Sequence, residues 1–257
     1  CYADGYAAEM YYGGNDDLSA TLSAGRATTG YLYFEVPVDA EVIEVKVIHS
    51  DVAINSTFEC SNETLNWTYN TFIHTMLCNM HTGHPSDCPH LERRGYTGDG
   101  QLTTHAVFSI MDAEKLYTKW LQDIGDCQDT LSGHIQYTAP YINSGGGPGG
   151  WGCAMVLVPY AYYQQYGETD MLADCYPAMV KWVEYLCGHS EGGLVVREED
   201  GGWCLGDWCT YDKCILPEPF VNTYFFVRSL DMLTEIAEVL DKRDDAEHFR
   251  VLSSDCR

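Results

Sequence analysis

Residues 61–80 read SNETLNWTYNTFIHTMLCNM, and the spacing of their apolar side chains decides the fold class. The apolar positions fall three and four residues apart, at Leu65, Tyr69, Phe72, Ile73, Met76, Leu77 and Met80. This spacing is the period of one face of an α-helix. Ser61 is a suitable N-cap, and Glu63 suits the first turn. The stretch therefore predicts an amphipathic helix.

The residues before this helix have a different period. Apolar and polar positions alternate over residues 30–37 and 41–49, which predicts β-strands. Two or three strands do not make an independent sheet, so we expect residues 1–55 to be the C-terminal strands of a β-sandwich domain. Residues 56–257 are predicted to form a second, mainly α domain. Its further helices are expected at residues 102–111, 113–127, 151–166, 170–187 and 220–240.

The excess of acidic residues limits the kinds of partner that the chain is expected to bind. The 257 residues carry 14 Lys and Arg against 38 Asp and Glu, a formal net charge of −24. Phosphate backbones and anionic lipid headgroups need cationic side chains to neutralise them, so we expect neither nucleic acid nor a membrane as partner. No apolar run approaches the roughly 18 residues of a bilayer-spanning helix. A neutral ligand is compatible with this acidic chain.

The chain contains 12 cysteines scattered along its length. The one tight group, Cys204, Cys209 and Cys214, has five-residue intervals, which do not match the short gaps of zinc sites. We predict no metal site and no cofactor. Cysteines scattered in this way are usually small, buried thiols in proteins of a reducing compartment, so their distribution favours a cytoplasmic location. Three N-glycosylation triplets leave the compartment open; they begin at Asn55, Asn62 and Asn66.

The densest polar segment, called the acid loop below, is residues 87–99, DCPHLERRGYTGD. Its Pro and Gly positions indicate a loop, and loops often carry functional residues. One interpretation is a loop tethered by ion pairs between Glu92 and the two arginines that follow it. The other is a sugar-binding pocket, in which one carboxylic acid protonates a leaving oxygen, other carboxylates hold hydroxyls and Tyr96 covers the C–H face. The pattern supports both interpretations equally.

Two further loops combine glycine with tryptophan. Trp151 ends the glycine run of residues 145–150, and Trp208 ends the segment GGWCLGDW at residues 201–208. Glycines let a backbone approach a ligand closely and leave an indole exposed, although a tryptophan also commonly anchors a loop on a core. Each of these loops precedes a predicted helix, as the acid loop does. Their recurrence predicts one mouth of a helical barrel formed by three loops.

These segments, in this order, resemble the bacterial α-L-rhamnosidases of glycoside hydrolase family 78. The resemblance begins at residues 49–52, HSDV, and continues through residues 58–66, FECSNETLN. It is most specific where D-C-P leads to E-R-x-G-[WY]-T-G-D, at residues 87–99. Through Gly150-Trp-Gly and Gly206-Asp-Trp it spans residues 45–242 in all, which is most of the chain.

The resemblance implies an inverting glycosidase that hydrolyses terminal α-L-rhamnosides, with Glu92 as the general acid. It implies that residues 56–257 are the first part of an (α/α)6 barrel, cut from a longer protein. The general base is then expected beyond Arg257, so that the fragment alone is expected to be inactive. The uncovered helix faces of a partial barrel would favour a homo-oligomer.

The resemblance also implies five sugar-binding residues: Asp87, Tyr96, Asp99, Trp151 and Trp208. The two carboxylates would hold rhamnose hydroxyls, and the tryptophans would pack against the apolar face and the C6 methyl group of the sugar. Tyr96 stands where the family often has Trp, and the acid loop is one residue shorter than the commoner form. Aligned backwards from Thr97-Gly-Asp, Glu92 keeps the position of the acid.

Two other hypotheses fit the same loops. A carbohydrate-binding protein that never hydrolyses its ligand would respond to Glu92→Gln through affinity alone. A helical-barrel glycosidase for another deoxy sugar, such as L-fucose, would present the same aromatic surface to a methyl group. Fold analogy does not separate these hypotheses from a rhamnosidase.

Overall fold

The computed structural model describes residues 2–3, 6–7, 9–11, 33–35, 39, 41, 43–44, 49–81, 83–89, 92–142, 150–196 and 216–257. The chain divides into two compact units, Cys1–Ile48 and His49–Arg257. The first unit contains β1 (Tyr2–Ala3), β2 (Tyr6–Ala7), β3 (Glu9–Tyr11), β4 (Tyr33–Glu35) and β5 (Ile43–Glu44). Strand β1 pairs antiparallel with β2 and β5, and β3 pairs with β4. The assignment of residues 1–55 to a β-sandwich stays a prediction.

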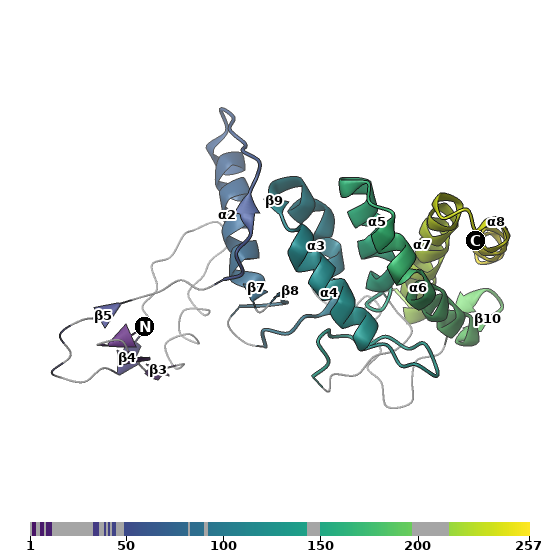
Figure 1. Cartoon of the computed structure of the whole chain (residues 1–257), viewed down its shortest axis with the longest axis horizontal. Coiled ribbons are helices and arrows are strands. Elements are labelled where there is room, and N and C mark those ends of the chain that lie inside the picture. The colour runs from purple at the N-terminus through teal and green to yellow at the C-terminus, as the bar shows by residue number, and fades with distance from the viewer. Residues whose placement is uncertain are drawn as a thin grey trace. The chain divides into compact units, whose positions relative to one another are not determined.

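The second unit is mainly helical, as predicted, and Figure 1 shows its helices side by side in chain order. The helices are α2 (Glu63–Asn79), α3 (Thr97–Ile110), α4 (Glu114–Asp126), α5 (Ala154–Tyr166), α6 (Asp170–Gly188), α7 (Glu218–Val239) and α8 (Arg243–Asp255). Short antiparallel strand pairs join β6 (Ala53–Ile54) to β9 (Met111–Asp112), β7 (Met80–His81) to β8 (His84–Pro85) and β10 (Ser190–Glu191) to β11 (Leu194–Val195).

Helix α2 is capped by Asn62 rather than by the predicted Ser61. The Oδ1 of Asn62 accepts hydrogen bonds from the backbone N–H groups of Thr64 and Leu65, at 3.0 and 3.3 Å. Asparagine satisfies the first free N–H groups of a helix as well as serine does. The apolar stripe of this helix is buried at Met76 near its C-terminus, whereas the Leu65 side chain is exposed.

Helix α3 begins at Thr97 rather than at the predicted residue 102. Gly98 and Gly100, whose type suggests a loop, lie inside the helix. A Cβ atom at Gly98 would overlap the Trp151 ring, and one at Gly100 would overlap the Trp120 ring. These glycines therefore let two indole rings pack directly on the helix backbone.

Helix α8 is absent from the prediction because its sequence is strongly polar. It buries only Ala246, Phe249 and Ser253, against α7. Its end is tied to α7 through Asp231, which accepts a hydrogen bond from Ser253 Oγ at 2.6 Å and pairs with Arg257. A narrow buried face and these contacts with α7 therefore stabilise this helix.

Helix α5 lies at the centre of the core. Residues 154–159 are all buried, and the helix contacts α3, α4, α6 and α7. A helix that is apolar on nearly every side is typical of a fully buried element. Phe108 of α3 packs edge-to-face on Tyr117 of α4 and on Tyr162 and Tyr166 of α5, with ring centroids 4.7 to 6.1 Å apart. This aromatic cluster fixes α3, α4 and α5 relative to one another.

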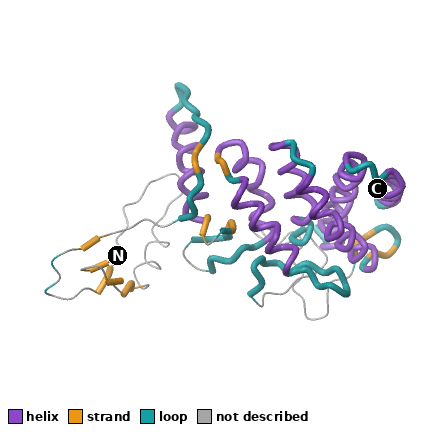
Figure 2. The backbone as a smooth tube through the Cα atoms, in the orientation of Figure 1, coloured by secondary structure: helices purple, strands orange, loops and turns teal. Residues whose placement is uncertain are grey.

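Connections at the two ends of the helices differ in length. Short connections, residues 111–113, 167–169 and 240–242, follow α3, α5 and α7, whereas residues 80–96, 127–153 and 189–217 lead into the same helices. Helix α3 contacts α5, and α5 contacts α7, so these helices are neighbours. Their N-terminal parts lie at one rim, because Gln101 of α3 donates to the carbonyl oxygen of Gly150, just before α5, and Gly150 packs on Phe225 of α7. Figure 2 shows the longer described loops along the lower ends of the helices. The three predicted loops all precede these helices in the chain.

Within the described ranges, every helix is too short or too polar to span a bilayer. No disulfide joins the cysteines of those ranges, which are Cys60, Cys78, Cys88, Cys127, Cys153, Cys175, Cys187 and Cys256. The group formed by Cys204, Cys209 and Cys214 lies outside the described residues. In the part of the chain that the structure describes, no three His, Cys, Asp or Glu side chains gather as metal ligands would.

Candidate active site

Hydrogen bonds of Asp87 close the acid loop. The N–H of Asp87 donates to the carbonyl oxygen of Arg94, and the N–H of Arg94 donates to Asp87 Oδ1, both at 3.0 Å. The Cys88 thiol donates to Asp87 Oδ2 at 2.9 Å. Both carboxylate oxygens of Asp87 thus hold the loop together, and each keeps a lone pair for a further donor. His90 and Leu91, at the tip of the loop, lie outside the described residues.

The C-terminal end of the acid loop is clamped by residues 137–139. The N–H of Thr97 donates to the carbonyl oxygen of Tyr137 at 2.8 Å, and the N–H of Ala139 donates to the carbonyl oxygen of Gly95 at 2.9 Å. Between these bonds, Tyr96 forms a β-bridge with Thr138. Tyr96 is also the N-cap residue of α3. The backbone around Tyr96 is therefore fixed from two sides.

Glu92 projects from the acid loop as an exposed carboxylate. Its Oε2 accepts a hydrogen bond from the Tyr96 hydroxyl at 2.8 Å and lies 3.8 Å from Arg94 Nε. The Arg93 guanidinium turns elsewhere, because its Nε donates to the carbonyl oxygen of Pro89 at 2.6 Å. One arginine of the predicted tether thus approaches Glu92, and the stronger contact comes from the tyrosine.

Asp99 lies in the first turn of α3, beside the acid loop. Although the residue is exposed, desolvation by the surrounding protein raises the pKa of its carboxyl group, and the negative charges of Asp87 and Glu92 add to this effect. Three carboxylates therefore share one small region, where they repel one another. Mutual repulsion of this kind costs stability and is common where a site must accept several hydrogen bonds from a ligand.

We expect Asp99→Asn to raise the free energy of unfolding at neutral pH. In the wild type, the pKa of Asp99 is higher in the folded state than in the unfolded state. The free energy of unfolding therefore falls as the pH rises from the ordinary carboxyl pKa to the raised pKa of the folded state. The increase in the free energy of unfolding caused by Asp99→Asn should therefore be present at about pH 7.5 and vanish below about pH 4, as measured by urea unfolding. Asp126→Asn, at the exposed end of α4, removes the same charge and is the control. An equal gain in both variants would contradict the expectation.

Trp151 packs on the start of α3. Its indole ring lies against the Gly98 backbone, with the Tyr137 ring beside it at a centroid distance of 6.1 Å. The Nε2 of Gln101, one turn further along α3, donates to the carbonyl oxygen of Gly150. The first two turns of α3 therefore fix both the indole ring and the backbone that carries it.

The structure thus brings five of the six predicted site residues to the N-terminal end of α3: Asp87, Glu92, Tyr96, Asp99 and Trp151. Trp208 lies outside the described residues. Three residues that support this site, Gly98, Gln101 and Tyr137, are absent from the prediction. Gly98 carried a signal in the motif T-G-D, but nothing in the local pattern of Tyr137 or Gln101 connects them with Trp151.

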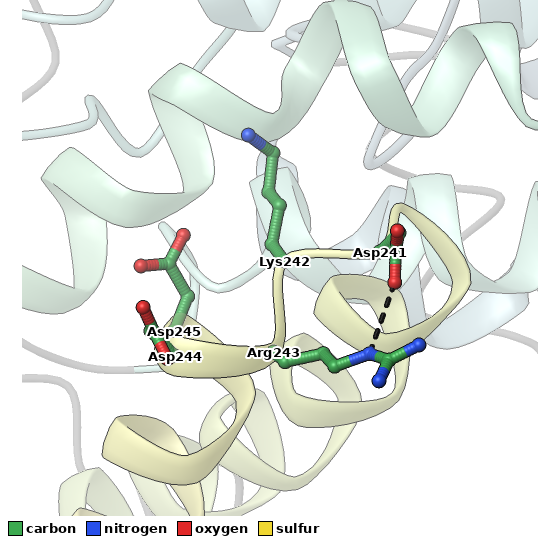
Figure 3. A pocket seen from close by; sticks show the side chains of 5 residues that line it. All are labelled: Asp241, Lys242, Arg243, Asp244 and Asp245. Atoms are coloured by element: carbon green, nitrogen blue, oxygen red, sulfur yellow. Dashed lines mark hydrogen bonds and ion pairs between the residues drawn. The ribbon is translucent and has the colours of Figure 1, made fainter.

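A cavity of about 380 Å³ at the turn from α7 to α8 is lined by Asp241–Asp245 (Figure 3). Arg243 pairs with Asp241 at 3.1 Å, and the Lys242 ammonium lies 4.8 Å from the centroid of the Tyr176 ring. The Tyr176 hydroxyl donates to Asp245 at 2.8 Å. These side chains join α6 to the turn that precedes α8, so the cavity is explained by helix packing.

Helices paired through short connections, with a carboxylate cluster and an indole ring at the N-terminal end of α3, are compatible with a domain built from helical hairpins that binds a sugar. Residues 54–257 match a family model described as the bacterial alpha-L-rhamnosidase six-hairpin glycosidase domain. The chain belongs to this family, as the sequence resemblance indicates. An α-L-rhamnosidase of Streptomyces avermitilis is 34% identical over 199 residues, which cover 77% of this chain and 18% of that protein.

Solved structures agree in fold. The α-L-rhamnosidase from Dictyoglumus thermophilum superposes with a TM-score of 0.75 at 29% identity, over 88% of this chain and 25% of that one. The Streptomyces avermitilis α-L-rhamnosidase complexed with L-rhamnose gives 0.74 at 31% identity, over 82% of this chain and 20% of that one. The chain spans about a fifth of the length of the curated relatives it matches, 18% and 21% for two of them.

Proposed function

We propose that the protein hydrolyses terminal α-L-rhamnosides with inversion at the anomeric carbon. The observation that carries the proposal is the exposed Glu92 carboxyl group, held by Tyr96 within a cluster of three carboxylates in a chain of this family. An exposed carboxyl group on a loop is accessible to a glycosidic oxygen. The α-L-rhamnosidase names of the relatives support the choice of sugar.

Besides Tyr96, which holds Glu92, five residues have a role in this proposal. Glu92 protonates the glycosidic oxygen as the bond to the anomeric carbon breaks. Asp87 and Asp99 accept hydrogen bonds from rhamnose hydroxyls, while Trp151 and Trp208 pack on the C–H face and the C6 methyl group. Water attacks the opposite face, activated by a second carboxylate.

The test is a panel of 4-nitrophenyl glycosides, namely α-L-rhamnoside, α-L-fucoside and β-D-glucoside, incubated with the protein at its natural full length. Hydrolysis of the rhamnoside alone is expected. Preference for the fucoside would overturn the choice of sugar. Binding of L-rhamnose without hydrolysis of any glycoside would instead favour a carbohydrate-binding protein.

We expect Trp151→Ala to weaken discrimination at C6 of the sugar. L-Rhamnose carries a methyl group where L-mannose carries CH₂OH, and an indole ring favours the methyl group. The ratio of kcat/KM for aryl α-L-rhamnoside over aryl α-L-mannoside should fall by about tenfold, the size of a methyl-scale effect in an apolar pocket. An unchanged ratio, with both substrates weakened equally, would mean that Trp151 only anchors its loop.

A further inference from the structure

Tyr96 combines a rigid backbone with a bond to the catalytic carboxyl group. Its backbone is held by the bridge to Thr138 and by the start of α3. Its hydroxyl donates to Glu92 Oε2 at 2.8 Å. The sequence prediction gives Tyr96 another role, that of a ring against the sugar, which requires no hydroxyl group.

Glu92, in contrast, has few contacts of its own. The side chain is exposed, its backbone N–H donates to the Cys88 sulfur at 3.4 Å, and the Arg94 guanidinium approaches only to 3.8 Å. Without Tyr96, a glutamate on a loop would sample several rotamers, since exposed side chains change rotamer freely. The 2.8 Å bond from Tyr96 is thus the contact that selects one orientation of this carboxyl group.

We propose that the Tyr96 hydroxyl positions the catalytic acid and fixes which of its oxygens carries the proton. This inference rests on the proposed function. In a protonated carboxyl group the carbonyl-type oxygen is the better acceptor, so the bond from Tyr96 to Oε2 favours the proton on Glu92 Oε1. As the glycosidic C–O bond breaks, that proton moves to the leaving oxygen, and Tyr96 continues to donate to the carboxylate that remains.

The state of the phenol agrees with this role. Burial, followed by the hydrogen bond to the Glu92 carboxylate, raises the pKa of Tyr96 above its ordinary value. The hydroxyl therefore stays protonated, and remains a donor, at every pH at which a carboxylic acid can act as the catalytic acid.

The experiment uses Tyr96→Phe, which keeps the ring and removes the hydroxyl group. Steady-state kinetics are measured on α-L-rhamnosides with different leaving groups. At one extreme 2,4-dinitrophenolate leaves without being protonated, and at the other an alkyl alcohol leaves only when its oxygen is protonated. Loss of positioning should lower kcat/KM by about 10- to 100-fold for the alkyl rhamnoside. The dinitrophenyl rhamnoside should lose less than about threefold, because its departure does not use the acid.

Tyr160→Phe is the matched control. Tyr160 of α5 donates to Glu235 of α7, so this variant also removes a hydrogen bond from tyrosine to glutamate, away from the acid loop. Its effect should be the same for every leaving group. A second readout is the double variant: in a Glu92→Gln background, Tyr96→Phe should cause no further loss.

An equal loss of kcat/KM for every leaving group in Tyr96→Phe would overturn the inference. Wild-type kinetics in Tyr96→Phe, together with a raised KM in Tyr96→Ala, would also overturn it and leave Tyr96 as a ring against the sugar. A wild-type protein that hydrolyses no rhamnoside would overturn the proposed function itself. That result appears before any variant is compared, so the two failures are distinct.

Discussion

Glu92→Gln is expected to lower kcat/KM for an alkyl α-L-rhamnoside by about 10²- to 10⁴-fold, the usual contribution of a general acid. The amide has the shape of the carboxyl group and can still accept the hydrogen bond from Tyr96, so the loop should keep its structure. What it lacks is a proton that can be transferred to the leaving oxygen. Steady-state hydrolysis by the full-length protein measures the effect.

Two controls separate chemistry from misfolding. The 2,4-dinitrophenyl rhamnoside should still be cleaved by Glu92→Gln, since its leaving group needs no proton. Glu235→Gln changes a glutamate that also accepts a hydrogen bond from a tyrosine, and it should behave as wild type. If Glu92→Gln were to cleave the alkyl rhamnoside at the wild-type rate, Glu92 would not be the acid.

Trp120→Ala should lower the free energy of unfolding by about 3–5 kcal/mol, the range for buried Trp-to-Ala changes. Trp120 of α4 is 0% exposed, and its ring fills the space beside Gly100 of α3. Its Nε1 donates to the carbonyl oxygen of Ala139 at 3.0 Å, and Ala139 in turn holds Gly95 of the acid loop. The change thus opens a cavity and removes a support of the site, so rhamnoside hydrolysis should fall as well.

Trp67→Ala is the control for this loss of an indole ring. Trp67 lies on α2 and is 56% exposed, so its removal should change stability by less than about 0.5 kcal/mol. Both variants are measured by urea unfolding. A cost below about 1 kcal/mol for Trp120→Ala would mean that the core closes around the missing ring, contrary to its rigid packing between α3 and α4.

Helices with an apolar stripe could be predicted from the sequence, because burial of that stripe is what stabilises them. The stretch from residue 61 to residue 80 and helices α4, α6 and α7 follow this rule, whereas α5 could be predicted from its continuous apolar run. The start of α3 could not be predicted, since the local pattern of Gly98 and Gly100 is that of a loop. Their conformation depends on two distant tryptophan rings, which no local pattern contains.

The same distinction applies to the site. The acid loop could be found because its three carboxylates lie within residues 87–99 and match a specific motif. The bond from Tyr96 to Glu92 spans only four residues, yet residue types alone do not show which donor turns toward which acceptor. The support that Tyr137 gives to Thr97 joins positions 40 residues apart, and only the folded chain places them together.

An inverting site converts an α-L-rhamnoside into β-L-rhamnose. The most direct measurement is a proton NMR time course of the hydrolysis of an aryl α-L-rhamnoside by the full-length protein, which identifies the first anomer of the released sugar. We predict that β-L-rhamnose appears first and then equilibrates with the α anomer. If α-L-rhamnose appeared first, or if no rhamnose were released, this site would not be an inverting rhamnosidase site.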